Sequence, residues 1–75
     1  MERKKVISSN INSIGYDEKS MTLEVEFYNQ KVYAYTPISQ EGYSLLMNAE
    51  SIGSFFAKNI KNNSNIKCTE VTIKE

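Results

Sequence analysis

The sequence predicts a single small α+β domain, an antiparallel β-meander of about three to four strands packed with two short helices. Residues 21–28 alternate between apolar and polar side chains, which is typical of a half-buried strand. A second strand-like run, 31–36, follows a short polar turn and ends at Pro37. Two later stretches, which begin after Ser39 and Ser51, carry apolar residues at helical spacing.

The length of 75 residues allows one domain, and we expect it to span 1–75, with a core over 6–61 and an extension over 62–75. Such a chain buries roughly 60% of its unfolded surface, so its stability is marginal. Cys68 is the only cysteine and histidine is absent, which excludes an intrachain disulfide and a Cys/His zinc site. We therefore expect no cofactor, and we expect self-association as a dimer or tetramer to supplement the core.

The start of the chain is loosely apolar, with Val6, Ile7, Ile11 and Ile14, before a turn at 15–20. In the following strand, side chains at alternate positions should face the core. These are Met21, Leu23, Val25 and Phe27.

The turn at Asn29 and Gln30 decides where two tyrosines lie, because a slip of one residue turns every side chain to the opposite face. A two-residue turn places Tyr33 and Tyr35 away from Leu23. A three-residue loop places both tyrosines in the core instead. Asn-Gln is a weaker turn signal than Asn-Gly, so both registers stay open.

Ser39 is a candidate N-cap for a helix that runs to about Asn48, and Ser51 is a candidate cap for a second helix. Residues 66–74 alternate again, which predicts a last strand at the sheet edge or at a subunit contact. The core-facing helix positions are Tyr43, Leu46 and Met47 in the first helix, and Ile52, Phe55, Phe56 and Ile60 in the second.

The composition argues against an enzyme. Without histidine, neither the usual general base near neutral pH nor a Ser-His-Asp arrangement is possible. The glycines are too far apart for a phosphate-binding loop. Glu24 and Glu26 lie on one strand face, where a solvated surface is the common explanation. We therefore expect a protein that binds without catalysing a reaction.

The expected location of the protein and its balanced charge limit the kinds of partner that it can bind. Each apolar stretch is far shorter than the ~20 residues that span a bilayer, and the first residues contain no signal-peptide core. We therefore expect no membrane contact and a cytoplasmic location. Nine basic residues balance nine acidic ones, so long duplex DNA is disfavoured, whereas a small nucleotide in a local pocket remains open.

Tyrosine is the residue type in this sequence best suited to binding a ligand, because the five tyrosines offer both stacking faces and hydrogen-bonding hydroxyls. Tyr33 and Tyr35 are the first candidates and Tyr16 follows, although each of them can instead pack in the core. Near the start of the chain, Arg3 and Lys5 either contact phosphate or belong to a frayed, solvated terminus.

Several spaced motifs resemble the KTSC domain family. They are Ser8-Ser9-Asn10-Ile11, Ile14-Gly15-Tyr16-Asp17, Leu23-Glu24-Val25-Glu26-Phe27, Tyr33-Ala34-Tyr35, and Ser51-Ile52-Gly53-Ser54-Phe55-Phe56 with Ile60. The resemblance covers about 6–61. It implies a β-meander followed by helices, found alone in bacterial and phage proteins or appended to some lysyl-tRNA synthetases. It also implies RNA binding, or the sponge activity of phage proteins that sequester cyclic nucleotide signals of anti-phage defence; a phage-encoded protein would act in the host cytoplasm.

Three hypotheses follow from these observations. The first is a non-catalytic binder of a small nucleotide, most specifically a sponge for a cyclic dinucleotide in immune evasion. The second is a module for short single-stranded RNA, and the third is a protein-interaction module. The candidate ligand-binding residues are Tyr33, Tyr35, Tyr16, Ser9, Asn10, Arg3, Lys5, Asn48, Ser51 and Lys58.

Overall fold

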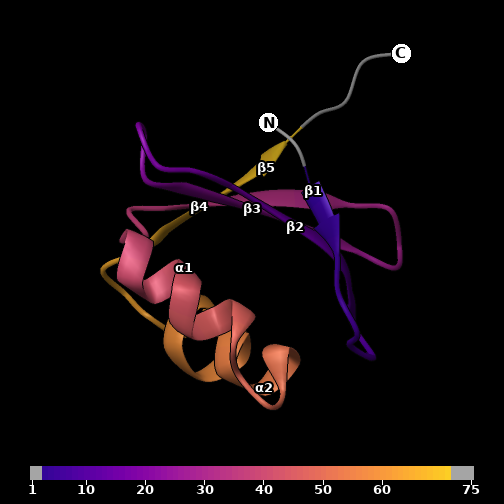
Figure 1. Cartoon of the computed structure of the whole chain (residues 1–75). Helices are drawn as coiled ribbons and strands as arrows, with labels where there is room; N and C mark the ends of the chain where they lie inside the picture. Colours follow the sequence, from indigo (N-terminus) through magenta and orange to yellow (C-terminus); the bar gives the residue numbers. More distant parts are fainter. Residues whose placement is uncertain (1–2, 72–75) are drawn as a thin grey trace.

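Five strands form one antiparallel sheet, and the helices pack on one of its faces (Figure 1). The computed structural model describes residues 3–71. Neighbours in the sheet follow the order β1-β2-β3-β4-β5, which is the order along the chain. The elements are the strands β1 (Arg3–Lys5), β2 (Ile11–Asp17), β3 (Thr22–Phe27), β4 (Val32–Thr36) and β5 (Lys67–Val71), the α-helices α1 (Gln40–Met47) and α2 (Ile52–Phe56), and the π-helix η1 (Ala57–Lys61).

The predicted α+β class and antiparallel meander are confirmed, but the predicted count of three to four strands is too low. The opening strand, β1, shows no apolar alternation, because it consists of one arginine and two lysines. It joins the sheet by pairing with β2 and by an ion pair of 2.9 Å between Arg3 and Glu24. Backbone pairing of this kind leaves no hydropathy signal in the sequence.

The β3–β4 hairpin has a three-residue loop. The Phe27 N–H donates to the Lys31 carbonyl oxygen, and the Gln30 N–H donates to the Phe27 carbonyl oxygen, both over 3.0 Å. Gln30 has a φ of 69°, as expected for a turn followed by a left-handed residue. In this register Tyr33 lies opposite Val25 and Tyr35 lies opposite Leu23. Both tyrosines therefore lie on the helix-covered face, as the three-residue alternative predicts.

We expect Gln30→Gly to raise the unfolding free energy by up to about 1 kcal/mol, because a side chain is strained at a left-handed φ. The control is Asn29→Gly. It removes the side-chain oxygen that accepts the Lys31 N–H, and it relieves no backbone strain, because Asn29 does not have a left-handed φ. It should lower stability. Urea unfolding of both variants tests the loop, and a Gln30→Gly variant less stable than the parent would contradict the register.

Both predicted helix caps are present. The Ser39 hydroxyl accepts the Gly42 N–H at 3.0 Å, and the Ser51 hydroxyl accepts the Ser54 N–H at 3.3 Å. The first helix ends at Met47, and the second continues into the π-helix. Sheet and helices together bury a core of Ile11, Ile14, Leu23, Val25, Tyr35, Ile38, Leu46, Phe56 and Ile60.

Tyr16 joins the sheet to α1. Its ring stacks on Tyr43, with centroids 4.6 Å apart and planes 8° apart, and its hydroxyl donates to the Ile38 carbonyl oxygen at 2.6 Å. Burial raises the pKa of Tyr16, and the charges of Glu18 and Asp17 raise it further. These contacts give Tyr16 a structural role between β2 and α1.

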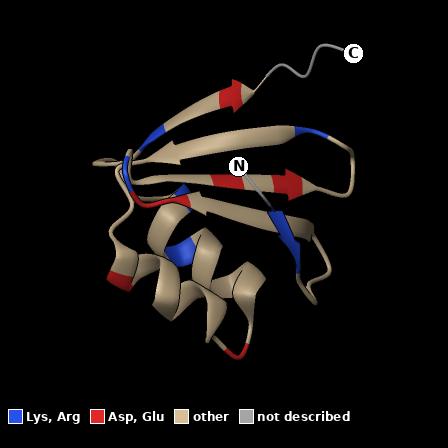
Figure 2. Cartoon of the chain, turned by 45° about the horizontal axis from the view of Figure 1, so that its top comes forward, with Lys and Arg blue, Asp and Glu red and all other residues tan. Residues whose placement is uncertain are grey.

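Charged residues are spread over the molecule and do not form one field (Figure 2). On the sheet face away from the helices, Glu24 pairs with Arg3, while Glu26 accepts hydrogen bonds from Asn12 and Ser13 at 3.0 and 2.8 Å. The carboxylates of β3 are thus held by neighbouring strands. Within residues 3–71, no helix has the length and apolar character needed to cross a membrane.

Candidate functional site

An aromatic pocket of about 380 Å³ lies where β3, β4 and β5 meet the end of η1. Its aromatic members come from alternate positions of β3 and β4, because those positions face the helices. Cys68 enters from β5, opposite Tyr35. The lining residues of this aromatic pocket are Phe27, Asn29, Tyr33, Tyr35, Lys61 and Cys68.

Edge-to-face contacts hold the rings of the pocket in place. Phe27 and Tyr33 have centroids 5.8 Å apart with planes at 68°. Tyr35 packs on Phe56 at 5.1 Å and 82°, and Phe56 also contacts Phe27. Arrangements of this kind are favourable beyond their buried area. Because Phe56 belongs to the core, the pocket wall is continuous with the core.

The two tyrosines of the pocket differ in exposure. Tyr35 is only 5% exposed, whereas Tyr33 is half-buried and keeps part of its ring accessible. Burial raises the pKa of Tyr35, and the nearby Cys68 and Tyr33 side chains raise it further. The Tyr35 phenol therefore stays protonated near neutral pH. Tyr33 is the tyrosine that a ligand can reach.

Lys61 is the only charged residue among those lining the aromatic pocket, and it lies exposed at the end of η1. Asn29 supplies an amide from the hairpin loop, where its side-chain oxygen already accepts the Lys31 N–H at 3.0 Å. The pocket thus offers aromatic rings, one cation and one amide. Such a set suits a ligand with a planar ring and an anionic group.

Most of the predicted site residues lie apart from one another. Tyr33 and Tyr35 lie in the aromatic pocket. Ser9, Asn10 and Ser51 line a separate hollow of about 330 Å³ between the β1–β2 loop and the start of α2. The others lie outside both: Asn48 lines a third hollow with Lys4 and Tyr43, Lys58 is exposed on η1, Arg3 and Lys5 belong to β1, and Tyr16 stacks on α1.

Several of these residues have a local structural role. Arg3 forms its ion pair with Glu24, so it is a strand residue with a carboxylate partner and does not belong to a frayed terminus. Ser51 caps α2. The Asn48 side-chain amide donates to the Ser44 carbonyl oxygen at 2.8 Å, at the end of α1. These contacts account for the three residues without a ligand.

Sequence reasoning missed four residues that line the aromatic pocket. Phe27 shares a face with the tyrosines only in the three-residue register, which the sequence left open. Asn29 was predicted only as a turn residue, and Lys61 was not among the candidate residues. Cys68 comes from the tail, where the predicted edge strand is confirmed as β5, although residues 72–74 of that prediction lie outside the described residues; the sequence did not indicate that β5 pairs with β4. The three-residue register of the hairpin would have supplied the first signal.

The sequence model of the KTSC domain matches residues 7–63. The chain belongs to the KTSC domain family. The crystal structure of a KTSC domain protein from Yersinia pestis is similar, with a TM-score of 0.85 and 32% sequence identity over 95% of this chain and 97% of that one. An uncharacterized protein of Stutzerimonas stutzeri (strain A1501) is 38% identical over 56 residues, which are 75% of this chain and 79% of that protein.

Two motifs of this KTSC domain touch in the fold. Ser8 accepts the N–H groups of Asn10 and Ile11, both at 3.3 Å, which shapes the β1–β2 loop. A Cβ at position 53 would lie 3.1 Å from the Ser8 hydroxyl oxygen, so Gly53 allows α2 to approach that loop closely. The Ser8–Ile11 motif and the Ser51–Phe56 motif therefore pack against each other and hold the β1–β2 loop close to α2.

Proposed function

We propose that this KTSC protein binds a small nucleotide without turning it over, and most specifically sequesters a cyclic dinucleotide signal as a sponge. The observation that carries the proposal is the aromatic pocket, in which the accessible ring of Tyr33 lies in one cavity with Lys61 and Asn29. A nucleotide presents the matching groups, which are a planar base, an anionic phosphate and hydrogen-bonding base edges.

In this proposal the base stacks on Tyr33, beside Phe27. Lys61 meets the phosphate and Asn29 contacts the base edge or the ribose. Binding pockets for small molecules span about 300–1,000 Å³, so a pocket of about 380 Å³ suits one nucleotide unit better than a whole dinucleotide. A cyclic dinucleotide would therefore need a pocket from each of two copies.

A two-fold oligomer supplies two such pockets, because a two-fold ligand matches a two-fold site. The pocket lies close to the end of the strand order, since Cys68 belongs to β5, which pairs with β4 alone among the described strands. A second copy can approach from that edge. We propose the homo-oligomer as a part of the binding function.

Binding without turnover is consistent with the groups present. The sequence contains no histidine, and no carboxylate lines the aromatic pocket. Glu24 and Glu26 on the opposite sheet face are engaged by Arg3, Asn12 and Ser13. None of these groups is placed for acid–base catalysis on a ligand in the pocket.

Single-stranded RNA would need aromatic rings on an open sheet face and a track of positive charge along the strand. The rings of Tyr33 and Tyr35 lie on the helix-covered face, and the basic residues are spread out (Figure 2). A small nucleotide in one pocket therefore has more support than an RNA strand.

The test is calorimetric titration of the full chain with a panel of cyclic dinucleotides and with a short single-stranded RNA, each at two salt concentrations. Labelling of Cys68 by a thiol reagent serves as the second readout, because this exposed cysteine lines the pocket. Tight binding of one cyclic dinucleotide that is recovered intact and slows labelling is the expected result. Salt-sensitive RNA binding alone would replace the proposal by an RNA module, and no binding in any titration would favour a protein partner.

A further inference from the structure

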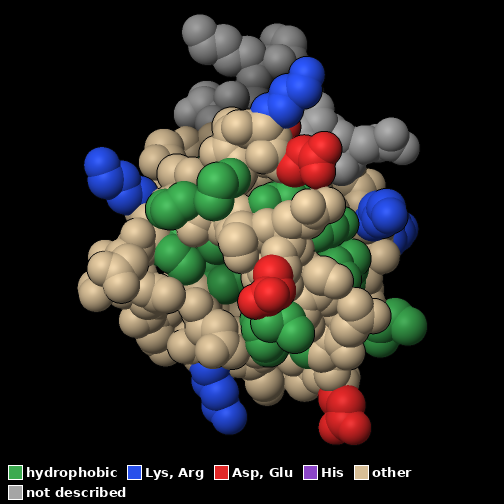
Figure 3. Space-filling model, turned by 60° about the vertical axis from the view of Figure 1, so that its left-hand side comes forward, with side chains coloured by type: hydrophobic (Ala, Val, Ile, Leu, Met, Phe, Trp, Pro, Cys, Tyr) green, Lys and Arg blue, Asp and Glu red, His purple; other side chains and the backbone are tan. Residues whose placement is uncertain are grey.

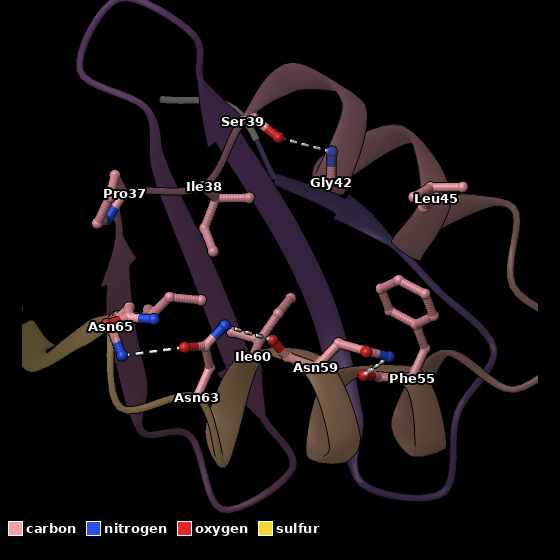
Figure 4. Close-up of a pocket in the computed structure, with 11 residues that line it drawn as sticks. Pro37, Ile38, Ser39, Gly42, Leu45, Phe55, Asn59, Ile60, Asn63 and Asn65 are labelled. Atoms are coloured by element: carbon pink, nitrogen blue, oxygen red, sulfur yellow. Dashed lines mark hydrogen bonds between the residues drawn. The ribbon is translucent and has the colours of Figure 1, made fainter.

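A further pocket, of about 370 Å³, lies between α1 and η1, away from the aromatic pocket (Figure 4). Three segments form it: the residues that lead into α1 and its first turns, the stretch from α2 into η1, and the connection to β5. We call it the interhelical pocket. Its lining residues are Pro37, Ile38, Ser39, Gly42, Leu45, Phe55, Asn59, Ile60, Asn63, Asn65 and Ile66.

The apolar side chains of the interhelical pocket range from buried to open. Ile38 and Ile60 are each 4% exposed and belong to the core, so their positions are fixed. Phe55 and Ile66 are half-buried and pack against that core. Leu45 is 54% exposed, which is high for a leucine. An apolar ligand would cover Leu45 while resting on Ile38 and Ile60.

Two of the three asparagine side chains that line the pocket, Asn59 and Asn63, are held by hydrogen bonds (Figure 4). The Asn59 amide donates to the Phe55 carbonyl oxygen at 3.1 Å, and the Asn63 amide donates to the Asn59 carbonyl oxygen at 3.4 Å. The Asn63 side-chain oxygen accepts the Asn65 N–H at 2.9 Å. Each amide has two donor hydrogens and an acceptor oxygen. Anchoring therefore leaves hydrogen-bonding capacity for a ligand.

No lysine, arginine, aspartate or glutamate is among the residues that line the interhelical pocket. On the left-hand side of the molecule as seen in Figure 1, hydrophobic side chains lie in several patches, with charged side chains among and around them (Figure 3). An ionised ligand would lose its hydration in the pocket without gaining a partner of opposite charge. The chemistry thus differs from that of the aromatic pocket, which contains Lys61.

We propose that the interhelical pocket binds a neutral molecule of one or two planar rings that has a hydrogen-bonding edge. The rings would lie on the apolar side chains, and the edge would meet the asparagine amides. The volume is ample, since an apolar cavity of about 150 Å³ accepts a benzene ring. This site is independent of nucleotide binding, because it shares no lining residue with the aromatic pocket.

The experiment is a titration of the ¹⁵N-labelled full chain with indole as the neutral probe and indole-3-acetate as its charged counterpart, followed by amide chemical shifts. We expect saturable shifts for indole at residues that line the interhelical pocket, and at least tenfold weaker binding of indole-3-acetate. Leu45→Glu should weaken indole binding at least tenfold, because it places a charge at the edge of the pocket. Ser44→Glu, at an adjacent exposed position outside the lining, should change it less than twofold.

Three results would overturn the proposal. The first is the absence of saturable shifts at the interhelical pocket. The second is equal weakening by Leu45→Glu and Ser44→Glu, which would show that any charge added to α1 acts alike. The third is indole binding that is lost on Tyr33→Ala and retained on Leu45→Glu, which would place the probe in the aromatic pocket.

Discussion

Replacing Tyr35 by alanine is expected to lower the unfolding free energy by about 3–5 kcal/mol, the range for deleting a buried aromatic ring. Tyr35 is 5% exposed, and its ring packs 5.1 Å from that of Phe56. At roughly 0.05–0.15 kcal/mol per residue, a domain of this length has a total stability of about 4–11 kcal/mol, so the loss is a large fraction of the total and equals it at the lower end of the range. Urea unfolding followed by circular dichroism measures it.

Two further variants separate the ring of Tyr35 from its hydroxyl. Tyr35→Phe keeps the ring and should stay folded, while Tyr33→Ala removes a half-buried ring and should cost less than Tyr35→Ala. The raised pKa of Tyr35 means that the folded state holds its proton more tightly than the unfolded state. The contribution of this proton to the unfolding free energy is therefore fully present below the ordinary tyrosine pKa of about 10, and it is lost progressively as the pH rises above that value. Tyr35→Phe should reduce this loss of stability at alkaline pH. A Tyr35→Ala protein that is folded and has the same unfolding free energy as the parent would show that Tyr35 is not a core residue.

Tyr33→Ala is expected to weaken binding of the cyclic dinucleotide by about 5- to 150-fold, because stacking of one base contributes about 1–3 kcal/mol. Lys61→Gln should also weaken binding, and it should reduce the dependence of affinity on salt, because it removes the cation in the pocket. Calorimetry at two salt concentrations measures both effects. Each variant must first be shown to unfold cooperatively, like the parent.

Lys58→Gln is the matched control for Lys61→Gln. Both lysines are exposed on η1, but only Lys61 lines the aromatic pocket. Lys58→Gln should therefore leave the affinity nearly unchanged. An equal loss of affinity in the two variants would mean that binding depends on the overall charge of the helix. The aromatic pocket would then lose its support as the binding site.

The parts of the fold that the sequence predicts well are those in which local pattern and tertiary structure agree. Alternation in β3 marks Leu23 and Val25 as core, and both are fully buried. Ser39 and Ser51 cap the helices because their hydroxyls satisfy free N–H groups nearby in the chain. The strand β1 escaped prediction because it is held by partners distant in sequence, among them Glu24.

The candidate site was harder to predict than the fold. Tyr33 and Tyr35 were identified by residue type, but their face depended on one loop residue, Gln30, whose left-handed backbone has no firm sequence signal. Lys61 and Cys68 lie on either side of the connection between η1 and β5. Only the tertiary structure shows that this connection brings both residues to the same pocket. Residue chemistry can thus nominate members of a site, whereas register and chain path decide which of them meet.

The position of β5 has a consequence for the dynamics of the aromatic pocket. Of the described strands only β4 pairs with β5, and four of the five β5 residues are exposed. Edge segments with little buried apolar surface are the first to open in local unfolding. Detachment of β5 would remove Cys68 from the pocket and from its position opposite Tyr35. A ligand that needs the closed pocket would therefore hold the sheet edge in place, and its measured affinity would include the free energy of ordering that edge.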